Sequence, residues 1–479
     1  MRVIDQQGST AASDAARAAP RHGRLHQRLS SFGVLLLTLS CLSPVFSIYG
    51  VGSDVLQHAG EGAANLFLIG IAAAMVWAVV YAELGSAYPY AGGDYVGVGS
   101  ILGPWAGAVT LAIWAVTAGP AVAFEAKIIG DYAAEMAPRA PVELVVYGSL
   151  GLAVVISLLA VRASAVVTGL FLAVEAVAVL ALIGLGLGRP ERGLAAVVLH
   201  PMALGAGGAL IPASIAVLAI GSVSAVYGAV GGNQAIYFGE ELRDPHRRMG
   251  GVIIAACLIG AFATAVPVIA VVLGARDFAA IVRSPAPIAA FVSEAAGPLA
   301  GRALSAAVAL AIFNAMIVQV MTNARLFFSL GRDRLFPGRA VNRFIAGVHH
   351  GSGAPRVATL VVGAFSAACC LLDSHTLLVF VTGLLVYGWS LVCLAVLIGR
   401  RRGQTGAPGY WRSPLFPLAP LLGLAMAAAF TVADLNDKAA GRPSLIVLGA
   451  VVVAAVVWSE LVLKRRPGGW TPALADVGA

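Results

Sequence analysis

The stretch C-L-S-P-V-F-S-I-Y-G-V-G, from Cys41 to Gly52, interrupts an apolar run that begins at Phe32 and is long enough to cross a bilayer. Pro44 has no amide hydrogen to donate, and its ring clashes with the carbonyl group four residues earlier. Gly50 and Gly52 weaken the helix further, because glycine is a poor helix former. The pattern therefore predicts two half-helices with a break between them.

A second interrupted apolar segment reads Y-G-A-V-G-G-N-Q, from Tyr227 to Gln234. In hydrocarbon an unpaired backbone N–H or C=O group is costly, so a broken helix is tolerated only where it is buried in protein or lines a wet cavity. Two interrupted spans in corresponding positions of two halves point to the central site of a transporter. We therefore expect the two breaks to lie close together around a ligand site.

The composition is that of an integral membrane protein. Of the 479 residues, 59% are hydrophobic and 11% are charged, whereas soluble domains carry about 25% charged residues. The five cysteines all lie in apolar runs without metal-ligand spacing, so we predict buried thiols, no metal site and no cofactor. The sequence shows no nucleophile–base constellation, phosphate-binding loop or dinucleotide fingerprint, which argues against an enzyme.

We expect an all-α polytopic protein of about twelve spans, because about 20 residues cross a hydrocarbon core of about 30 Å. The predicted spans cover residues 33–57, 63–83, 100–136, 142–160, 164–188, 210–239, 250–274, 301–328, 356–373, 376–399, 415–434 and 443–463. The third is too long for a simple span and is expected to begin or end outside the hydrocarbon.

Lysine and arginine are concentrated before the first span and after even-numbered spans. By the positive-inside rule both termini are cytoplasmic, and we place the chain in the cell (inner) membrane. Residues 1–31 are predicted to form a disordered basic tail. A nucleic-acid-binding arm is the alternative, but attraction to the anionic inner leaflet explains the charge as well. We therefore expect the lipid bilayer, and no nucleic acid, as a partner.

Four polar motifs recur at the cytoplasmic ends of the predicted spans. They read A-E-L-G-S-A-Y-P-Y-A-G-G-D-Y (82–95) leading into I-L-G-P-W-A-G (101–107), F-G-E-E-L-R-D-P-H-R-R (238–248), N-A-R-L-F-F-S-L-G-R-D-R-L-F-P (323–337) and Y-W-R-S-P-L-F-P-L-A-P (410–420). Their order and positions resemble those of the amino acid-polyamine-organocation (APC) superfamily, in particular its amino acid permeases.

This resemblance implies a LeuT-like fold of two inverted five-helix repeats with broken helices 1 and 6. The repeats would cover residues 32–188 and 210–399, followed by two accessory spans over 415–463 and a cytoplasmic tail over 464–479. The resemblance also implies a secondary active transporter that moves an amino acid or related amine by alternating access and is coupled to protons. An exchanger, a sodium-coupled symporter and a ligand sensor that does not transport remain alternatives.

The two breaks supply the predicted substrate-binding groups. Half-helix N-termini suit a substrate carboxylate, expected at the amides of residues 48–50, and unwound carbonyl groups suit an ammonium group. The alternative is that small residues here only let helices pack closely. The predicted set is Ser43, Pro44, Ser47, Ile48, Tyr49 and Gly50 in span one, and Tyr227, Gly228, Gly231 and Asn233 in span six.

Span six departs from the permease pattern. The family has F-x-G followed by an aromatic residue and an acid, whereas A-V-G-G-N (229–233) keeps Gly231 but places Gly232 and Asn233 at the next two positions. Loss of the ring predicts a roomier or differently capped pocket, with Tyr49, Tyr227 or Tyr237 as the lid. A polyamine pocket is expected to gather acids, and neither break contains one.

Glu175 lies in the middle of span five, in A-V-E-A-V. A carboxylate at bilayer depth is costly, burial favours its neutral form, and such residues are functional candidates. Our hypothesis is that Glu175 couples transport to protons. A structural carboxyl group bonded to a neighbouring helix and a cation site are the alternatives.

Other polar residues gather near the ends of spans. Lys127 and Asp131 share a helix face at the outer end of span three, close to Glu125, and we predict an ion pair between them. A vestibule contact for the substrate is the alternative. The polar residues of span eight either line the path or form interhelical hydrogen bonds; they are Asn314, Gln319, Thr322 and Asn323. An inner gate is predicted from acid–base pairing at the end of span six, among Glu240, Glu241, Arg247 and Arg248.

Overall fold

The computed structural model describes residues 29–465, except 91, 138, 140, 160–164, 206–208, 333, 337 and 348–354. Residues 1–28 of the predicted N-terminal tail and residues 466–479 of the predicted C-terminal tail lie outside the described residues.

Helices dominate the described chain. The first half contains α2 (Ser31–Leu42), α3 (Pro44–Phe46), the π-helix η1 (Ser47–Gly52), α4 (Ser53–Ala59), η2 (Gly60–Gly62), α5 (Ala63–Ala87), α6 (Asp94–Leu102), α7 (Pro104–Met136), α8 (Val142–Leu159), α9 (Ala165–Gly188) and α10 (Leu194–Leu199). The second half contains β1 (Met202–Leu204), β2 (Leu210–Pro212), α11 (Ile215–Ala229), η3 (Gly232–Glu241), α12 (Pro245–Gly274), α13 (Phe278–Arg283), α14 (Pro287–Ala296), α15 (Pro298–Arg332), α16 (Arg339–Ile345), α17 (Arg356–Cys369), α18 (Ser374–Arg401), α19 (Leu418–Asn436), α20 (Gly441–Trp458) and η4 (Ser459–Leu463).

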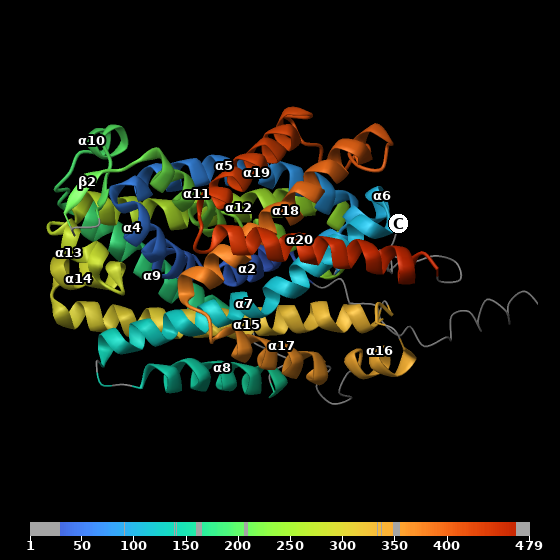
Figure 1. Cartoon of the computed structure of the whole chain (residues 1–479), viewed down its shortest axis with the longest axis horizontal. Helices are drawn as coiled ribbons and strands as arrows, with labels where there is room; N and C mark the ends of the chain where they lie inside the picture. Colours follow the sequence, from blue (N-terminus) through green and yellow to red (C-terminus); the bar gives the residue numbers. More distant parts are fainter. Residues whose placement is uncertain are drawn as a thin grey trace, which may run out of the picture.

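The described residues contain nine helical runs that are long and apolar enough to cross a membrane. The first run, Ser31–Ala87, makes two passes, because the chain reverses between α4 and α5 (Figure 1). Gly60 at this reversal has a φ of 60°, and a Cβ there would lie 2.4 Å from the Met202 carbonyl oxygen, so the turn requires glycine. With the shorter apolar helices α8 and α17, the chain makes about twelve passes. The predicted all-α polytopic class is confirmed.

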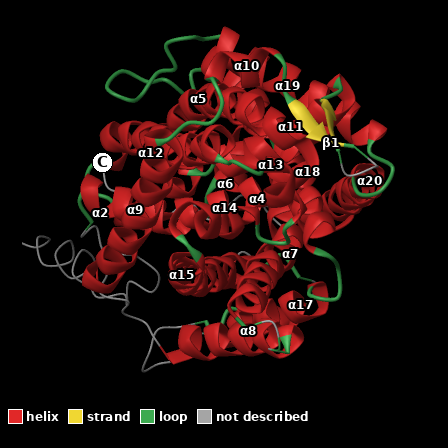
Figure 2. Cartoon of the chain, turned by 90° about the vertical axis from the view of Figure 1, so that its left-hand side faces the viewer, coloured by secondary structure: helices red, strands yellow, loops and turns green. Residues whose placement is uncertain are grey.

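The long helices run side by side along the longest axis of the molecule (Figure 1). α10, α13 and α14 mark one end, which is the predicted outer end, and α6 and α16 mark the other (Figure 1). Seen from the predicted outer end, α8 and α17 lie at the edge of the bundle, whereas α4 lies near its middle (Figure 2). Buried apolar side chains fill the interior, so a polar group there needs a partner or a ligand.

Two local features differ from the prediction. The predicted third span, 100–136, is divided between α6 and α7, because Gly103 has a φ of 101° and Pro104 then begins a new helix. The predicted sixth span, 210–239, begins in an antiparallel pair of strands, β1 and β2. Its helix starts only at Ile215, where the Ser214 hydroxyl caps α11 by accepting a hydrogen bond from the Val217 amide.

Candidate functional site

Span one is broken at Ser43. This residue has the left-handed backbone angles φ 37° and ψ 89°, and it separates α2 from the helix that begins at Pro44. Proline is tolerated at the first position of a helix, because the amide there has no intrahelical partner. The Ser43 hydroxyl accepts a hydrogen bond from the Phe46 amide over 3.3 Å. The break is therefore sharp and carries its own cap.

The break is narrower than the sequence predicts. The predicted amide donors Ile48, Tyr49 and Gly50 lie in η1, which continues directly into α4, so they are inside a helix and not at a free N-terminus. The physical reason is packing: a Cβ on Gly52 would lie 2.8 Å from Val268 Cγ2, so glycine brings this segment against α12. At Gly52 the alternative stated above, that small residues let helices pack closely, therefore agrees with the structure, and the predicted break does not extend this far.

Glu175 of α9 reaches the break in span one. The Ser43 hydroxyl donates a hydrogen bond to Glu175 Oε2 over 3.3 Å, and both residues are buried. The other carboxylate oxygen, Oε1, has no hydrogen-bond partner among the described residues. The first turn of the second half of span one carries the positive end of the helix dipole. It thus faces a carboxylate of the protein itself.

Span six is broken between α11 and η3. Val230 is extended, with φ −102° and ψ 139°, and η3 then begins at Gly232 as a 3-10 helix of ten residues. Runs of this helix longer than three or four residues are uncommon, because its hydrogen-bond geometry is poorer than that of an α-helix. Tyr227 and Gly228, predicted to lie in the break, form the last turn of α11.

The two breaks are adjacent. A Cβ on Gly231 would lie 1.9 Å from Leu42 Cδ2, at the end of α2. A Cβ on Gly228 would lie 3.1 Å from Val51 Cγ1, in the π-helical segment. Protein interiors are close-packed, so contacts this short leave no room for a side chain on Gly231. The predicted proximity of the two interruptions is present.

A cavity of about 40 Å³ lies beside the break in span six. A water molecule occupies about 30 Å³ in the liquid, so this conformation is closed around the cavity and leaves no room for an amino acid. The lining residues are uncharged and come from four spans: Trp114, Thr117, Ala118 and Ala121 from α7; Tyr227, Val230, Gly231, Asn233 and Gln234 from span six; Gln319 and Asn323 from α15; and Val381, Leu385 and Trp389 from α18.

Three of the lining side chains carry buried polar atoms without a hydrogen-bond partner in the described part of the chain. They are Asn233 Nδ2, Gln234 Oε1 and Trp389 Nε1. Buried polar groups are nearly always paired, so each of these calls for an explanation. Two donors and one acceptor around one cavity form a set that a ligand with a carboxylate and an ammonium group can satisfy.

The predicted substrate-binding residues separate into two groups. Tyr227, Gly231 and Asn233 line the cavity, whereas Gly228 and all the predicted residues of span one lie outside its lining. Spans three, eight and ten also contribute to the lining, and Gln319 and Asn323 are the predicted polar residues of span eight that reach it. Span one approaches the site through the contact between Leu42 and Gly231.

The predicted consequence of Gly232 differs from what the structure shows. A Cβ on Gly232 would lie 2.5 Å from Cys257 Sγ and 2.6 Å from the Cys257 backbone nitrogen, so this position faces α12 and no aromatic ring fits there. The missing ring therefore does not enlarge the cavity in this conformation. Of the three proposed lids only Tyr227 lines the cavity. The ring of Tyr237 packs edge-on against Trp114, with centroids 6.2 Å apart, and that of Tyr49 against Tyr132, at 5.6 Å.

At the predicted inner gate, backbone hydrogen bonds join the end of η3 to the residue Leu29, which lies just before α2. The Leu29 amide donates to the Glu241 carbonyl over 2.9 Å, and the Arg243 amide donates to the Leu29 carbonyl over 3.1 Å. Within the described chain, no ion pair joins Glu241 to Arg247 or Arg248. Asp244, with a φ of 54°, changes the direction of the chain between η3 and α12. Glu241 therefore lies on η3, whereas Arg247 and Arg248 lie on α12.

The prediction for α7 also differs from the structure. Glu240 of the predicted gate is buried at the end of η3, and its ion pair stays a prediction. No ion pair joins Lys127 to Asp131 in the part of α7 that is described. Glu125, two residues before Lys127, is buried, and its Oε2 atom has no hydrogen-bond partner among the described residues. Glu125 is therefore an interior carboxylate and not part of an outer ion pair.

Sequence reasoning missed the role of Asp94, at the start of α6. Its carboxylate accepts hydrogen bonds from the Tyr81 hydroxyl over 2.8 Å and from the Trp114 indole N–H over 3.2 Å. Asp94 lies outside the spanning runs, and burial raises its pKa to about 7. Because Trp114 lines the cavity, Asp94 positions one wall of the site. In the sequence, Asp94 could have been noticed as an acid in a glycine-rich loop between two apolar runs.

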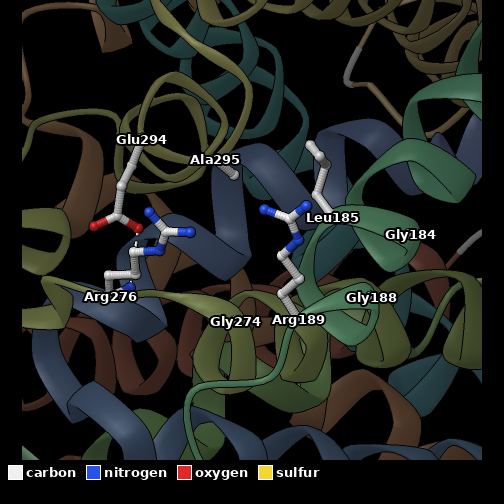
Figure 3. A pocket seen from close by; sticks show the side chains of 8 residues that line it. All are labelled: Gly184, Leu185, Gly188, Arg189, Gly274, Arg276, Glu294 and Ala295. Carbon is white, nitrogen blue, oxygen red and sulfur yellow. Dashed lines mark hydrogen bonds between the residues drawn. The ribbon is translucent and has the colours of Figure 1, made fainter.

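A larger pocket, of about 330 Å³, lies at the predicted outer end between α9, α12 and α14 (Figure 3). Arg189 and Arg276 both extend toward it, and the Arg276 backbone amide donates to Glu294 over 3.0 Å (Figure 3). Gly184, where α9 first lines this pocket, lies nine residues beyond Glu175, about 14 Å along a helix. The pocket is therefore separate from the two breaks.

Two interrupted spans packed side by side within an all-α polytopic bundle define a membrane transporter, not an enzyme. The sequence profile described as amino acid permease matches residues 29–457. The chain therefore belongs to the amino acid permease family. It is also similar to the branched-chain amino acid permease BcaP of Lactococcus lactis subsp. cremoris (strain MG1363), at 23% identity over 408 residues, which cover 78% of this chain and 82% of that protein.

Proposed function

We propose that this chain is a proton-coupled carrier of amino acids with apolar side chains, working by alternating access. The observation that carries the proposal is the cavity beside the break in span six, where three buried polar atoms lack partners and every lining residue is uncharged. An α-amino acid brings one carboxylate and one ammonium group, which suit these donors and this acceptor. Alanine, valine and leucine in the lining favour an apolar substrate side chain. The name of the similar BcaP protein is in keeping with this substrate class.

The closed cavity supports alternating access. At about 40 Å³ it holds no amino acid, so the helices around it must separate to admit one. Carriers of this architecture move parts of the bundle around a fixed central site. The 3-10 segment η3 and the single-residue break at Ser43 supply places where the backbone can adjust.

Glu175 is the proposed proton-coupling residue. It contacts the break in span one through Ser43, and one of its oxygens has no partner in the described chain. Taking up a proton changes Glu175 from an acceptor alone to a group that also donates. The hydrogen bond from Ser43 and the attraction to the positive end of the half-helix are then both weakened. A proton on Glu175 thus loosens the contact between α9 and span one.

Uptake of radiolabelled leucine by the purified protein in liposomes tests the proposal. We expect accumulation driven by an inward proton gradient and independent of sodium. Glu175→Gln is expected to keep leucine exchange between the two sides but to lose acceleration by the gradient. Asp434→Asn is the control, because Asp434 is also a buried carboxylate but is not bonded to Ser43 and does not line the cavity. Gradient-driven uptake by Glu175→Gln at the wild-type rate contradicts the coupling role, and binding without accumulation by the wild type identifies a sensor.

The cavity is tested separately by leucine affinity. A hydrogen bond to a charged group contributes about 1.5–3 kcal/mol, so Asn233→Ala is expected to weaken leucine binding by about 10- to 100-fold. Asn314→Ala on α15 is the control, since Asn314 also has a buried amide nitrogen without a partner in the described chain but does not line the cavity. Equal effects of the two substitutions would place the substrate elsewhere.

A further inference from the structure

Three side chains that can bind a metal ion converge at the predicted outer end of the bundle. Asp54 and His58 are four residues apart on α4, so they share one helix face. His375 is the second residue of α18, more than 300 positions later in the chain. His375 Nδ1 lies 2.9 Å from Asp54 Oδ1, and His58 Nδ1 lies 3.5 Å from the same oxygen. One carboxylate oxygen therefore lies between two imidazole nitrogens from two different spans.

The two imidazole rings lie face to face. Their centroids are 4.2 Å apart and their planes differ by 24°. One ligand atom from each of the three side chains can be chosen so that all lie within 4.8 Å of one another. An ion with four tetrahedral bonds of about 2.0–2.1 Å holds its ligand atoms about 3.4 Å apart. An imidazole nitrogen binds an ion in the plane of its ring, so the two rings must rotate out of their face-to-face arrangement for all three side chains to contact one ion.

The surroundings favour a cation that arrives from solution. The exposed fractions of the side chains are 45% for His58, 27% for His375 and 12% for Asp54, so the cluster is open on one side. Asp373 and Asp437 lie close enough to His375 to act on its charge. Two neutral imidazoles and a carboxylate form a nitrogen and oxygen set that Zn²⁺ accepts, with water at the fourth position.

We propose that Asp54, His58 and His375 form a binding site for Zn²⁺ that ties the outer end of α4 to the start of α18. The site is independent of the proposed amino acid cavity, because none of its three residues lines that cavity. Asp54 holds His375 by a hydrogen bond already, so the two helices need little movement to bind the ion. His58 Nδ1 is also hydrogen-bonded to the Asp54 backbone carbonyl over 2.8 Å, and coordination to the ion replaces the hydrogen bond between the Asp54 and His375 side chains by three coordinate bonds.

Calorimetric titration of Zn²⁺ into the full-length protein tests the proposal. The protein is purified in detergent and freed of metal and of any polyhistidine tag. It carries His349→Gln and His350→Gln, because two consecutive histidines in the sequence can bind Zn²⁺ by themselves. We expect one ion per chain, and a melting temperature that Zn²⁺ raises because the ion binds the folded state. Co²⁺ in place of Zn²⁺ is expected to give the visible absorption of a tetrahedral site.

Single substitutions at the three positions identify the ligands. We expect each of the three substitutions His58→Gln, His375→Gln and Asp54→Asn to weaken Zn²⁺ binding by at least about 10- to 100-fold. This is the loss typical when a residue that only hydrogen-bonds to a metal ligand is removed. His200→Gln is the matched control, because His200 is exposed in a loop at the same end. Melting curves with chelator test whether each variant is folded. If His375→Gln is not folded, His375→Asn takes its place. Absence of saturable binding, or binding that His375→Gln leaves unchanged, would overturn the proposal.

Discussion

Replacement of Glu83 by glutamine is expected to destabilise the protein strongly. Glu83 is fully buried near the end of α5, and Arg400, at the end of α18, is 16% exposed. The carboxylate accepts hydrogen bonds from Arg400 Nε, the Thr405 hydroxyl and the Ser413 amide, each over 2.8 Å, and another from Arg400 Nη2. A glutamine amide replaces one accepting oxygen by a donor, so two of these four donors then face an NH₂ group.

The magnitude follows from these contacts. Hydrogen bonds to charged groups contribute about 1.5–3 kcal/mol each, and breaking a buried ion pair costs about 3–5 kcal/mol, so we expect Glu83→Gln to lose about 3–5 kcal/mol. The unfolding entropy is about 2.1 cal/mol/K per residue, so in a chain of this length a loss of 1 kcal/mol of unfolding free energy lowers the melting temperature by about 1 °C. The expected fall in melting temperature is therefore about 3–5 °C, measured by thermal unfolding in detergent.

The control is Glu460→Gln, which breaks the half-exposed pair between Glu460 and Lys464. Surface pairs contribute about 0–1 kcal/mol, so its melting temperature should change by less than about 1 °C. The double variant Glu83→Gln/Arg400→Gln should lose less than the sum of the two single losses, because the two residues share one network. A Glu83→Gln protein that melts within 1 °C of the wild type would refute the reasoning.

Three other contacts give predictions of their own. Asp94→Asn should flatten the pH dependence of stability. The pKa of Asp94 is raised to about 7, so between about pH 4 and 7 the folded state keeps a proton that the unfolded chain releases. The free energy of unfolding of the wild type should therefore fall by up to about 4 kcal/mol over this range, measured as a falling melting temperature. Gly231→Ala should cost about 1–3 kcal/mol of unfolding free energy by pressing on Leu42, and adding Leu42→Ala should restore part of it. Zn²⁺ outside liposomes should slow leucine uptake by the wild type but not by His375→Gln, because the ion ties α4 to α18.

Much of the fold follows from features that are local in sequence. Apolar runs of about 20 residues predict the spans, and Pro44 predicts the break in span one, because both effects act within a few residues. The same local information misjudged the width of that break. Gly52 weakens a helix in isolation, yet here it removes a clash with Val268, 216 positions further along the chain. A helix-breaking glycine and a packing glycine have the same sequence pattern.

The candidate site is predictable only in part for the same reason. Glu175 stands out in the sequence as a lone acid in an apolar span, but its bond to Ser43 joins residues 132 positions apart. Asn233 is visible as a departure from the permease pattern, whereas its neighbour Trp389 becomes part of the site only through the packing of α18. Asp54 and His375 are likewise brought together by the bundle alone. Residue types can be read from the chain, but their convergence depends on how the spans pack.

The separation of the cavity from the break in span one affects where a substrate carboxylate binds. The positive end of the half-helix that begins at Pro44 already faces Glu175, and two carboxylates at one helix terminus repel each other. While Glu175 is charged, the unpartnered donors at Asn233 and Trp389 are therefore the better partners for the substrate carboxylate. Once Glu175 takes up a proton, the repulsion ends and the half-helix can attract the substrate as well. The proposed coupling thus needs no direct contact between the proton and the substrate, because both act on the charge balance at the same helix terminus.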